Sequence, residues 1–398
     1  MTTIQEVYPM QYTDFKDLKI SRLGFGAMRL PMDAEGKIEP DHVQKMVDYA
    51  LAHGINYFDT AYKYHAGESE NYLGRALAKH PRESFFLADK MPSWLCGEES
   101  DVKKIFEEQL GKCGVEYFDF YLMHNVDEEG WDDIVKMHMF EHLKEEKEAG
   151  RIRHLGASFH CSAEFLDKVL STYDDYIEFV QLQINYFDWE YDKAYEYYDV
   201  ARKHERPIII MEPVRGGMLA NPMSEEACRL LDEAAAEGSA CRAAEGKANY
   251  AAYALKFCNE LPGILTTLSG MSTYEQLVDN INTFEAPDMT AEEKAAVDAA
   301  AKAIQSDIII PCTACNYCDE CPSGIKIPEI FKMYNVAASK GFHHIWGSLS
   351  GQYYGLETTA SACIECGACE SHCPQKIQII EELKKIDAKY AHLKEIGE

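Results

Sequence analysis

Residues Ile55–Lys90 read INYFDTAYKYHAGESENYLGRALAKHPRESFFLADK, two short apolar runs separated by an amphipathic one. The runs Ile55–Thr60 and Ser84–Lys90 predict β-strands, and Glu68–Lys79 between them predicts an α-helix. Two strands joined by a helix are typical of a parallel strand–helix–strand unit. The same alternation continues on both sides of this stretch, so the unit is one of a series.

The series contains eight predicted strands between about residue 20 and residue 285, each followed by a helical pattern. Eight such units over roughly 250 residues are typical of a closed (β/α)₈ barrel. Apolar runs such as IIIM fit a parallel sheet that is buried on both faces. The predicted strands are Ile20–Gly26, Ile55–Thr60, Ser84–Lys90, Phe118–His124, Ile152–Ser158, Phe179–Asn185, Pro207–Met211 and Ile264–Leu268.

The other predicted helices include Asp41–His53, Asp101–Cys113 and Tyr191–His204. An open doubly wound sheet is the main alternative to the barrel. That fold needs a glycine-rich phosphate loop after its first strand, and Gly24–Arg29 (GFGAMR) does not complete GxGxxG. The pattern therefore favours the α/β class and a TIM barrel.

The composition changes sharply after a final alanine-rich helix, for which Thr290 is the predicted cap and Glu293 its capping-box partner. Beyond Pro311 the chain is rich in Cys, Gly and Pro and in short helical patterns. We expect a barrel domain over residues 1–305 and a small, mainly helical domain over residues 306–398.

The small domain contains eight of the fourteen cysteines, in two tight runs. Two-residue gaps let successive thiolates reach three corners of one [4Fe–4S] cubane, and a fourth cysteine followed by Pro commonly ligates the other cluster. Structural zinc is the alternative, but a zinc ribbon uses two CxxC pairs per ion, whereas each run here has four cysteines and ends in Cys-Pro. The runs are Cys312, Cys315, Cys318 and Cys321, then Cys363, Cys366, Cys369 and Cys373.

This spacing resembles the bacterial two-cluster ferredoxin module and predicts two [4Fe–4S] clusters in a ferredoxin-like domain. Cys373 would join the first three cysteines of the first run on one cluster, and Cys321 would join the first three of the second run on the other. The first run has two rather than three residues before its last cysteine, which departs from the usual spacing at Cys321.

Charge and hydropathy restrict the partners. The chain has 39 basic and 67 acidic residues, a difference of −28. A surface this acidic repels phosphate backbones and anionic lipid, so we expect neither nucleic acid nor a membrane as a partner. The first residues show no signal-peptide pattern, and no apolar stretch is long enough to span a bilayer, so we expect a cytoplasmic protein.

Four chemistry-bearing residues lie at or just after predicted strand ends: Asp59, Tyr64, Lys90 and His124. The carboxyl ends of barrel strands are where catalytic groups collect. Reduction of a ketone needs a proton donor, and a tyrosine can serve if a nearby cation lowers its pKa. In this hypothesis Lys90 supplies the charge, Asp59 holds Lys90, and His124 donates a hydrogen bond to the carbonyl oxygen. Tyr62 is the competing tyrosine.

With the segments LADK, DFYLMHN, GRIRHLGAS and VQLQINYFD, residues 15–285 resemble the aldo/keto reductase superfamily in order and interval. The added cluster domain resembles the iron–sulfur branch of that superfamily. The resemblance implies the tetrad above, with Tyr64 rather than Tyr62 as its tyrosine, and a nicotinamide cofactor extended across the barrel mouth. It also implies these cofactor contacts: Ser158, Gln181, Glu212, Gly216, Gly270, Ser272, Gln276 and Asn280.

Three positions depart from the family pattern. Phe159 stands where Asn is usual, and Gly270 and Gln276 stand where relatives that use NADPH have Lys and Arg. A 2′-phosphate would lack those charge-assisted partners, so the sequence leans towards NADH. Arg215 and Arg29 are the cations that would compensate.

The expected function is hydride transfer between NAD(P)H and a carbonyl or alcohol substrate, with the clusters structural or relaying electrons from a redox partner protein. Hydride carries two electrons and a cluster passes one, a conversion that ordinarily needs a flavin or radical, and the sequence shows no flavin fingerprint. The alternative is a catalytically silent barrel in an electron-carrier or redox-sensing module. The substrate is not specified by the sequence.

Overall fold

The computed structural model describes residues 9–221, 224–243, 246–307, 309–340 and 342–395. They form two compact units. The first consists of the described residues of Met1–Val214 and Ala236–Ala291, and the second of those of Arg215–Ala235 and Glu292–Glu398. The boundary expected near residue 306 remains a prediction, because this spatial grouping is not a division by chain position.

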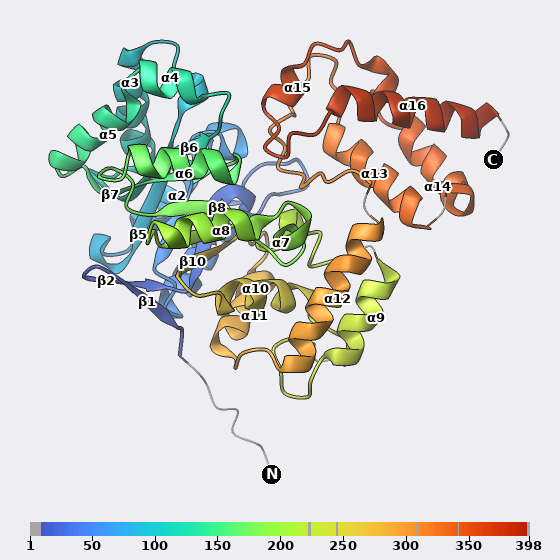
Figure 1. Ribbon diagram of the computed structural model, residues 1–398, viewed down its shortest axis with the longest axis horizontal. Coiled ribbons are helices and arrows are strands. Elements are labelled where there is room, and N and C mark those ends of the chain that lie inside the picture. Colours follow the sequence, from blue (N-terminus) through green and yellow to red (C-terminus); the bar gives the residue numbers. More distant parts are fainter. Residues whose placement is uncertain (1–8, 222–223, 244–245, 308, 341, 396–398) are drawn as a thin grey trace. The chain divides into compact units, whose positions relative to one another are not determined.

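The first unit is a closed barrel of eight parallel strands in the order β10-β3-β4-β5-β6-β7-β8-β9, as predicted. Figure 1 shows the strands enclosed by helices, among them α2, α3, α6 and α8. The strands are β3 (Leu23–Gly26), β4 (Tyr57–Asp59), β5 (Phe86–Pro92), β6 (Phe118–Val126), β7 (Ile152–Phe159), β8 (Val180–Gln183), β9 (Ile208–Met211) and β10 (Ile264–Ser269).

The helices of this unit are α1 (Pro40–Ala52), α2 (Ser69–Leu77), α3 (Glu99–Cys113), α4 (Trp131–Lys136), α5 (Met139–Glu148), α6 (Ala163–Thr172), α7 (Asp188–Tyr191), α8 (Ala194–Lys203), α10 (Tyr250–Glu260) and α11 (Tyr274–Glu285). Short 3₁₀ turns are η1 (Ala27–Arg29), η2 (Tyr64–Gly67), η3 (Arg82–Ser84) and η4 (Ser93–Leu95). Gly54, Gly114 and Gly150, which follow α1, α3 and α5, all have positive φ, as glycines at helix ends commonly do.

One predicted strand was wrong in its extent. Residues Ile20–Gly26 are divided between β2 (Leu18–Ser21) and β3, and β2 pairs antiparallel with β1 (Tyr12–Phe15) in a separate hairpin. Phe15 and Ile20 of this hairpin join the apolar cluster inside the barrel, where Phe15 lies 5.7 Å from Phe120 between ring centroids. The apolar residues of the hairpin therefore extend the core.

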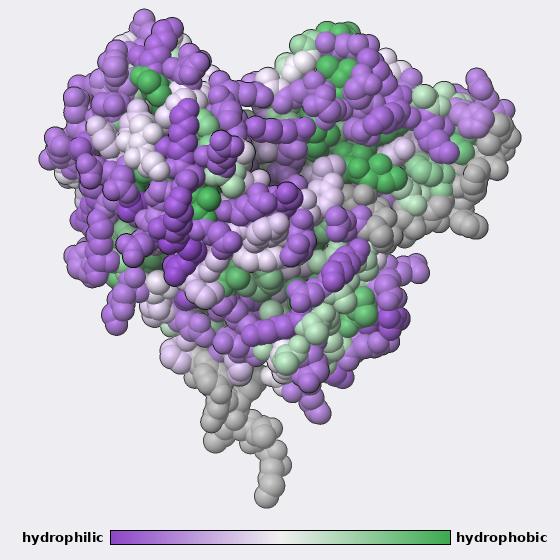
Figure 2. All heavy atoms as spheres, viewed as in Figure 1, coloured by the Kyte–Doolittle hydropathy of each residue, from purple (hydrophilic) through white to green (hydrophobic). Residues whose placement is uncertain are grey.

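Alternation along the strands gives the unit two apolar layers. Tyr57, Ala88 and Phe120 point into the barrel, whereas their neighbours Phe58 and Tyr121 pack in the layer between strands and helices. Burying a side chain of the size of Phe120 stabilises the fold by about 1.5–3 kcal/mol. Hydrophilic residues cover most of the face of the barrel seen in Figure 2.

The second unit is helical. It contains η5 (Arg215–Gly217), α9 (Glu225–Ala234), α12 (Ala291–Asp307), α13 (Ile327–Lys340), α14 (Phe342–Tyr354), η6 (Ala360–Ala362), α15 (Ala368–Ser371) and α16 (Ile379–Glu395). Its core includes Phe331, Tyr353 and Tyr390, and six of the clustered cysteines pack against that core. Within the described part of the chain, no helix is both long and apolar enough to cross a bilayer.

Candidate functional site

Three polar side chains face one another at the carboxyl end of the barrel. Asp59 ends β4, Lys90 lies near the end of β5 and His124 near the end of β6. Each is two residues beyond an inward-facing apolar residue of its strand (Tyr57, Ala88 and Leu122). Since alternate residues of a strand point to the same side, the three polar side chains also point inward.

Lys90 is the centre of this group. Its Nζ donates hydrogen bonds to Asp59 Oδ1 at 2.6 Å and to the carbonyl oxygen of Thr60 at 2.7 Å, and its side chain is 1% exposed. Burial raises the pKa of Asp59, and the positive charge of Lys90 and its hydrogen bond counter that effect. A buried ammonium is thus held by an anion and a carbonyl at the barrel mouth.

The tyrosine after β4 completes the group. Tyr64 begins η2, is 8% exposed, and lies edge-on to His124 with ring centroids 6.2 Å apart. Lys90 Nζ is 5.0 Å from the centroid of its ring. The competing Tyr62 instead donates its hydroxyl hydrogen bond to the Glu108 carboxylate at 3.0–3.1 Å. The placement favours Tyr64 over Tyr62.

His124 is held neutral by its surroundings. Burial lowers its pKa well below the usual value, and the charges of Lys90 and His160 lower it further. Its Nδ1 is buried without a hydrogen-bond partner among the described residues. A neutral imidazole with an N–H can donate a hydrogen bond to a carbonyl oxygen, but it carries no charge of its own at neutral pH.

The predicted nicotinamide contacts lie on neighbouring strands. Ser158 of β7 and Gln181 of β8 are register partners, and both side chains are buried. Ser158 Oγ accepts a hydrogen bond from the backbone N–H of Asn125 at 2.9 Å. Within the part of the chain that the structure describes, Gln181 Oε1 is buried and has no hydrogen-bond donor. An amide NH₂ such as that of nicotinamide is a donor that fits this oxygen.

Four more predicted cofactor contacts, Gly270, Ser272, Gln276 and Asn280, lie in or beside the loop after β10. Gln276 Oε1 accepts from the backbone N–H of Ser272 at 2.8 Å, and Asn280 Nδ2 donates to Ser269 Oγ at 2.9 Å. A Cβ at Gly270 would lie 3.3 Å from the side chain of Arg29, so this arginine packs on the loop.

Two further predicted contacts come from the segment after β9. Glu212 has a positive φ of 56°, and its carbonyl oxygen accepts from Asn185 Nδ2 at 3.0 Å. Gly216, with a φ of 64°, and Arg215 belong to the second unit.

Sequence reasoning did not identify two neighbours of the tetrad. Trp94 in η4 is 38% exposed, and its ring centroid lies 5.0 Å from that of His124. Asn125 has a positive φ of 56°, and its N–H reaches Ser158. A Trp four residues after Lys90 was a usable signal for the first, whereas the conformation of Asn125 left no mark in the sequence.

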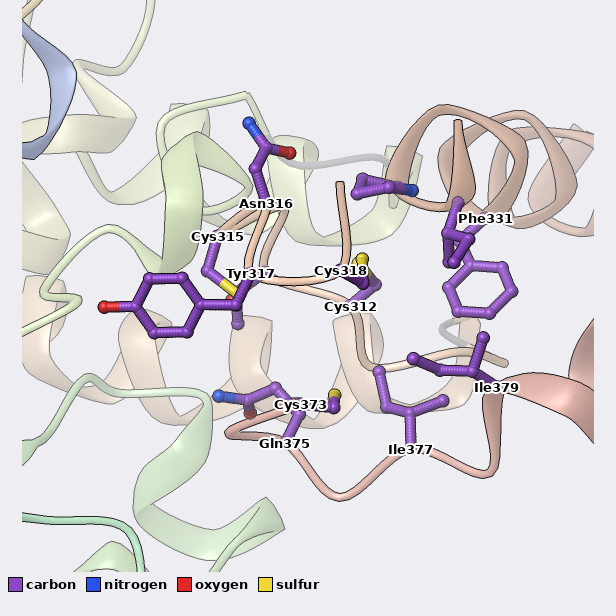
Figure 3. Close-up of a pocket in the computed structure, with 13 residues that line it drawn as sticks. Cys312, Cys315, Asn316, Tyr317, Cys318, Phe331, Cys373, Gln375, Ile377 and Ile379 are labelled. Atoms are coloured by element: carbon purple, nitrogen blue, oxygen red, sulfur yellow. The ribbon is translucent and has the colours of Figure 1, made fainter. Parts of the chain in front are cut away.

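In the second unit, four cysteines predicted for one cluster line a single cavity. Cys312, Cys315 and Cys318 come from one loop and Cys373 from the other. Figure 3 shows these cysteines around the cavity, with the apolar side chains of Phe331, Ile377 and Ile379 together on one side of it.

The thiols of this cavity interact. Burial raises the pKa of Cys318, and the neighbouring Cys315, Cys312 and Cys373 raise it further. Backbone N–H groups point at the sulfurs as well. The N–H of Ala314 donates to Cys312 Sγ at 3.4 Å. Burial raises the pKa of Cys373, and three backbone N–H groups that follow it oppose that rise. Amide donors of this kind stabilise charge on a thiolate.

Three of the other four cysteines, Cys321, Cys363 and Cys369, form a second group. Burial raises the pKa of Cys369 to about 11, and the charges of Glu370, Cys363 and Cys321 contribute. Cys366 is exposed at the tip of the loop. The exchange of the fourth ligand between the two runs remains a prediction.

Both cysteine loops have the same backbone shape. The residues on either side of the middle cysteine have positive φ in each run: Ala314 and Asn316 around Cys315, and Glu365 and Gly367 around Cys366. Left-handed residues of this kind turn successive N–H groups towards one centre, as anion-binding loops do. Within the described residues, no three His, Cys, Asp or Glu side chains are grouped closely enough to hold a single metal ion. The thiols, the cavity and the amides fit a cubane.

Comparison with known proteins gives a consistent result. Residues 22–302, more than half of the chain, match the family model described as "Aldo/keto reductase family", and residues 311–378 match "4Fe-4S dicluster domain". The chain is 25% identical over 309 residues to the uncharacterized oxidoreductase YqkF of Bacillus subtilis, covering 72% of this chain and 94% of that protein.

Two further relatives extend the comparison. The aldo-keto reductase str7 of Strobilurus tenacellus is 30% identical over 213 residues, covering 50% of this chain and 60% of that protein. Among solved structures, the aldo-keto reductase AKR11C1 of Bacillus halodurans (holo form) superimposes with a TM-score of 0.58 at 25% identity, covering 74% of this chain and 97% of that one.

Proposed function

Because the chain belongs to the aldo/keto reductase family, with a 4Fe–4S dicluster domain at its C-terminal end, we propose that its barrel transfers hydride between a nicotinamide cofactor and a small carbonyl or alcohol substrate. The observation that carries the proposal is the buried Lys90 ammonium, bonded to Asp59 at 2.6 Å and 5.0 Å from the ring of Tyr64. A phenol beside a fixed cation is an acid that can act near neutral pH.

The side chains divide the work. Reduced nicotinamide supplies a hydride to the carbonyl carbon when it is bound. Tyr64 gives its hydroxyl proton to the carbonyl oxygen, so that an alcohol forms and a phenolate remains, which Lys90 stabilises. His124 orients the carbonyl oxygen through a neutral hydrogen bond, since its pKa lies well below the usual value. Gln181 and Ser158 would hold the carboxamide. Solvent returns the proton to Tyr64.

We propose NADH as the preferred cofactor. Gly270 and Gln276 bring no positive charge to the loop after β10, and Gln276 already bonds the N–H of Ser272. Arg29, which packs on Gly270, is the cation that would favour NADPH instead. The ratio of kcat/KM for NADH to that for NADPH in wild type tests this preference and should exceed one. A fall in the NADPH value alone in Arg29→Met would show that Arg29 contacts the 2′-phosphate.

The test of the activity is anaerobic turnover of the purified, cluster-loaded protein. A panel of aldehydes and ketones is offered with NADH and with NADPH, and cofactor oxidation is followed by absorbance. Stoichiometric formation of alcohol supports the proposal. Absence of turnover with every substrate, together with absence of nicotinamide binding by fluorescence, would refute it and favour a catalytically silent barrel in an electron-carrier or redox-sensing module.

The two groups of cysteines support a second, separate proposal about the clusters. We propose that they are structural or form a surface for a redox partner protein, with electron relay to the barrel as the alternative. Anaerobic titration with NADH, followed by EPR, distinguishes these roles. Clusters that stay oxidised support the first, and clusters reduced by NADH support relay and require a flavin or radical step between hydride and cluster.

A further inference from the structure

Behind Lys90, on the outer face of β5, lies a buried polar layer that the reaction above does not use. Asp89 points out of the barrel because Lys90 points in. It packs with Glu70 of α2 and Gln109 of α3, and all three side chains are fully buried. Burying two carboxyl groups costs free energy unless they are hydrogen-bonded and their charge is compensated. We therefore expect this layer to have a function.

The layer holds both peptide groups of Lys90. Asp89 Oδ1 accepts the backbone N–H of Lys90 at 2.8 Å. Gln109 Nε2 donates to the carbonyl oxygen of Lys90 at 3.0 Å and to Glu70 Oε1 at 3.0 Å. Tyr121 fixes the orientation of Gln109 by donating to its Oε1. Strand β4 pairs with β5 as far as Asp59↔Ala88. Beyond that pair, side chains take the place of β4 as hydrogen-bond partners of the β5 backbone.

The charges of the layer favour one retained proton. Glu70 Oε2 lies 3.2 Å from Lys112 Nζ, and Lys112 is shared with Glu108 at 3.1 Å. Asp89 itself accepts hydrogen bonds from the N–H of Lys90 and from the thiol of Cys113, and among the described residues no lysine or arginine forms an ion pair with it. Burial raises the pKa of Asp89 well above its usual value, the charge of Glu70 raises it further, and Lys90 opposes both.

Other titratable groups face the pair from α3 and β6. Cys113 Sγ lies 3.8 Å from Asp89 Oδ2, and burial followed by the Asp89 charge raises the pKa of this thiol. Burial likewise raises the pKa of the Tyr121 phenol, with Asp89 and Glu70 adding to it. Both groups stay neutral at physiological pH, so neither offsets a second negative charge.

We propose that Asp89, Glu70 and Gln109 are positioning residues that hold Lys90 at the barrel mouth, and that Asp89 keeps its proton while they do so. The proposal rests on the proposed function for its kinetic consequence only. When this proton is lost at alkaline pH, a negative charge forms behind the strand close to Glu70, and the Asp89 to Lys90 contact is disturbed. The reductase then loses activity through Lys90, separately from any titration of Tyr64.

The kinetic test compares pH profiles of kcat and KM for reduction of para-nitrobenzaldehyde with NADH. Asp89→Asn keeps an acceptor for the Lys90 N–H on a side chain that cannot ionise, so it should retain most of the neutral-pH kcat and move the alkaline limb upward. Asp89→Ala loses the contact to the Lys90 N–H. Gln109→Leu loses the link to the Lys90 carbonyl, and a displaced catalytic group costs on the order of 10-fold to 100-fold in kcat. Glu107→Gln, exposed on the same helix and paired with Arg151, is the matched control.

A second readout does not need activity. The infrared difference spectrum of wild type minus Asp89→Asn should contain the carbonyl band of a protonated carboxyl group at neutral pH, and Glu70→Gln should remove or shift it. The proposal is overturned if that band is missing, or if the Asp89→Asn profile superimposes on the wild-type profile. If wild type turns over no carbonyl but the band is present, the proposed function fails while the protonated state of Asp89 stands.

Discussion

Replacing Tyr64 by Phe removes one oxygen from the proposed proton donor and little else. The ring of Tyr64 makes its contacts with His124, at 6.2 Å between centroids, and with Lys90 Nζ, at 5.0 Å, through its aromatic face and edge, which Phe retains. The ion pair of Lys90 and Asp59 does not involve the hydroxyl. The contacts of the ring are therefore kept, the expected loss is in proton transfer, and the fold and cofactor affinity should not change.

The expected size follows from that confinement. A positioned general acid contributes roughly 10²-fold to 10⁴-fold to a rate. At about 1.36 kcal/mol for each factor of ten, Tyr64→Phe should raise the barrier by about 2.7–5.5 kcal/mol. The fall should appear in kcat, with NADH binding within a factor of about two of wild type.

Tyr62→Phe is the matched control. It removes the same atom two residues earlier, where the hydroxyl bonds the exposed Glu108 carboxylate at 3.0–3.1 Å. We expect kcat to change by less than about twofold, since such a bond contributes on the order of 1 kcal/mol to stability and nothing to the reacting atoms. The assay is single-turnover reduction at saturating NADH. Reasoning from this site would be refuted if Tyr64→Phe kept half of its activity, or if Tyr62→Phe lost as much.

Three more predictions follow from particular contacts. Gln181→Ala removes the buried amide oxygen that lacks a donor, and should weaken NADH binding on the order of 10-fold by fluorescence titration; unchanged affinity would contradict the proposed carboxamide contact. Cys373→Ser should leave about half of the iron and no magnetic coupling between clusters in EPR, whereas Cys96→Ser, a buried barrel thiol, should keep all of it; full iron content in Cys373→Ser would exclude Cys373 as a ligand. Burial raises the pKa of Glu178, but bonds from His154, Lys147, Lys16 and the N–H of Leu155 lower it well below the usual value. The stabilisation by the Glu178 carboxylate is therefore present at neutral pH and lost as the pH falls below about 4.3. Glu178→Gln should lower the free energy of unfolding by about 1–3 kcal/mol at neutral pH and by little in acid. An equal loss at both pH values in thermal unfolding would contradict this assignment.

The eight barrel strands were predictable because each is a short apolar run between helical patterns, and a parallel sheet buried on both faces leaves that mark in any sequence. The hairpin of β1 and β2 was missed because four-residue strands with mixed exposure carry no such run. The cysteine runs were equally predictable, because the spacing of ligands within one loop is a local property of the sequence.

Other features depended on residues far apart in the sequence. Tyr62 and Tyr64 are chemically identical, and only the 3₁₀ turn after β4 directs one to Lys90 and the other to Glu108. The two buried acids behind Lys90 come from different elements, Asp89 from β5 and Glu70 from α2. In the sequence, Asp89 looks like any polar residue near a strand end. The sequence by itself determined the repeating strand pattern and the cysteine spacing, because both are local. Only tertiary structure decided which polar groups meet, because burial, charge and hydrogen bonding depend on neighbours that distant segments supply.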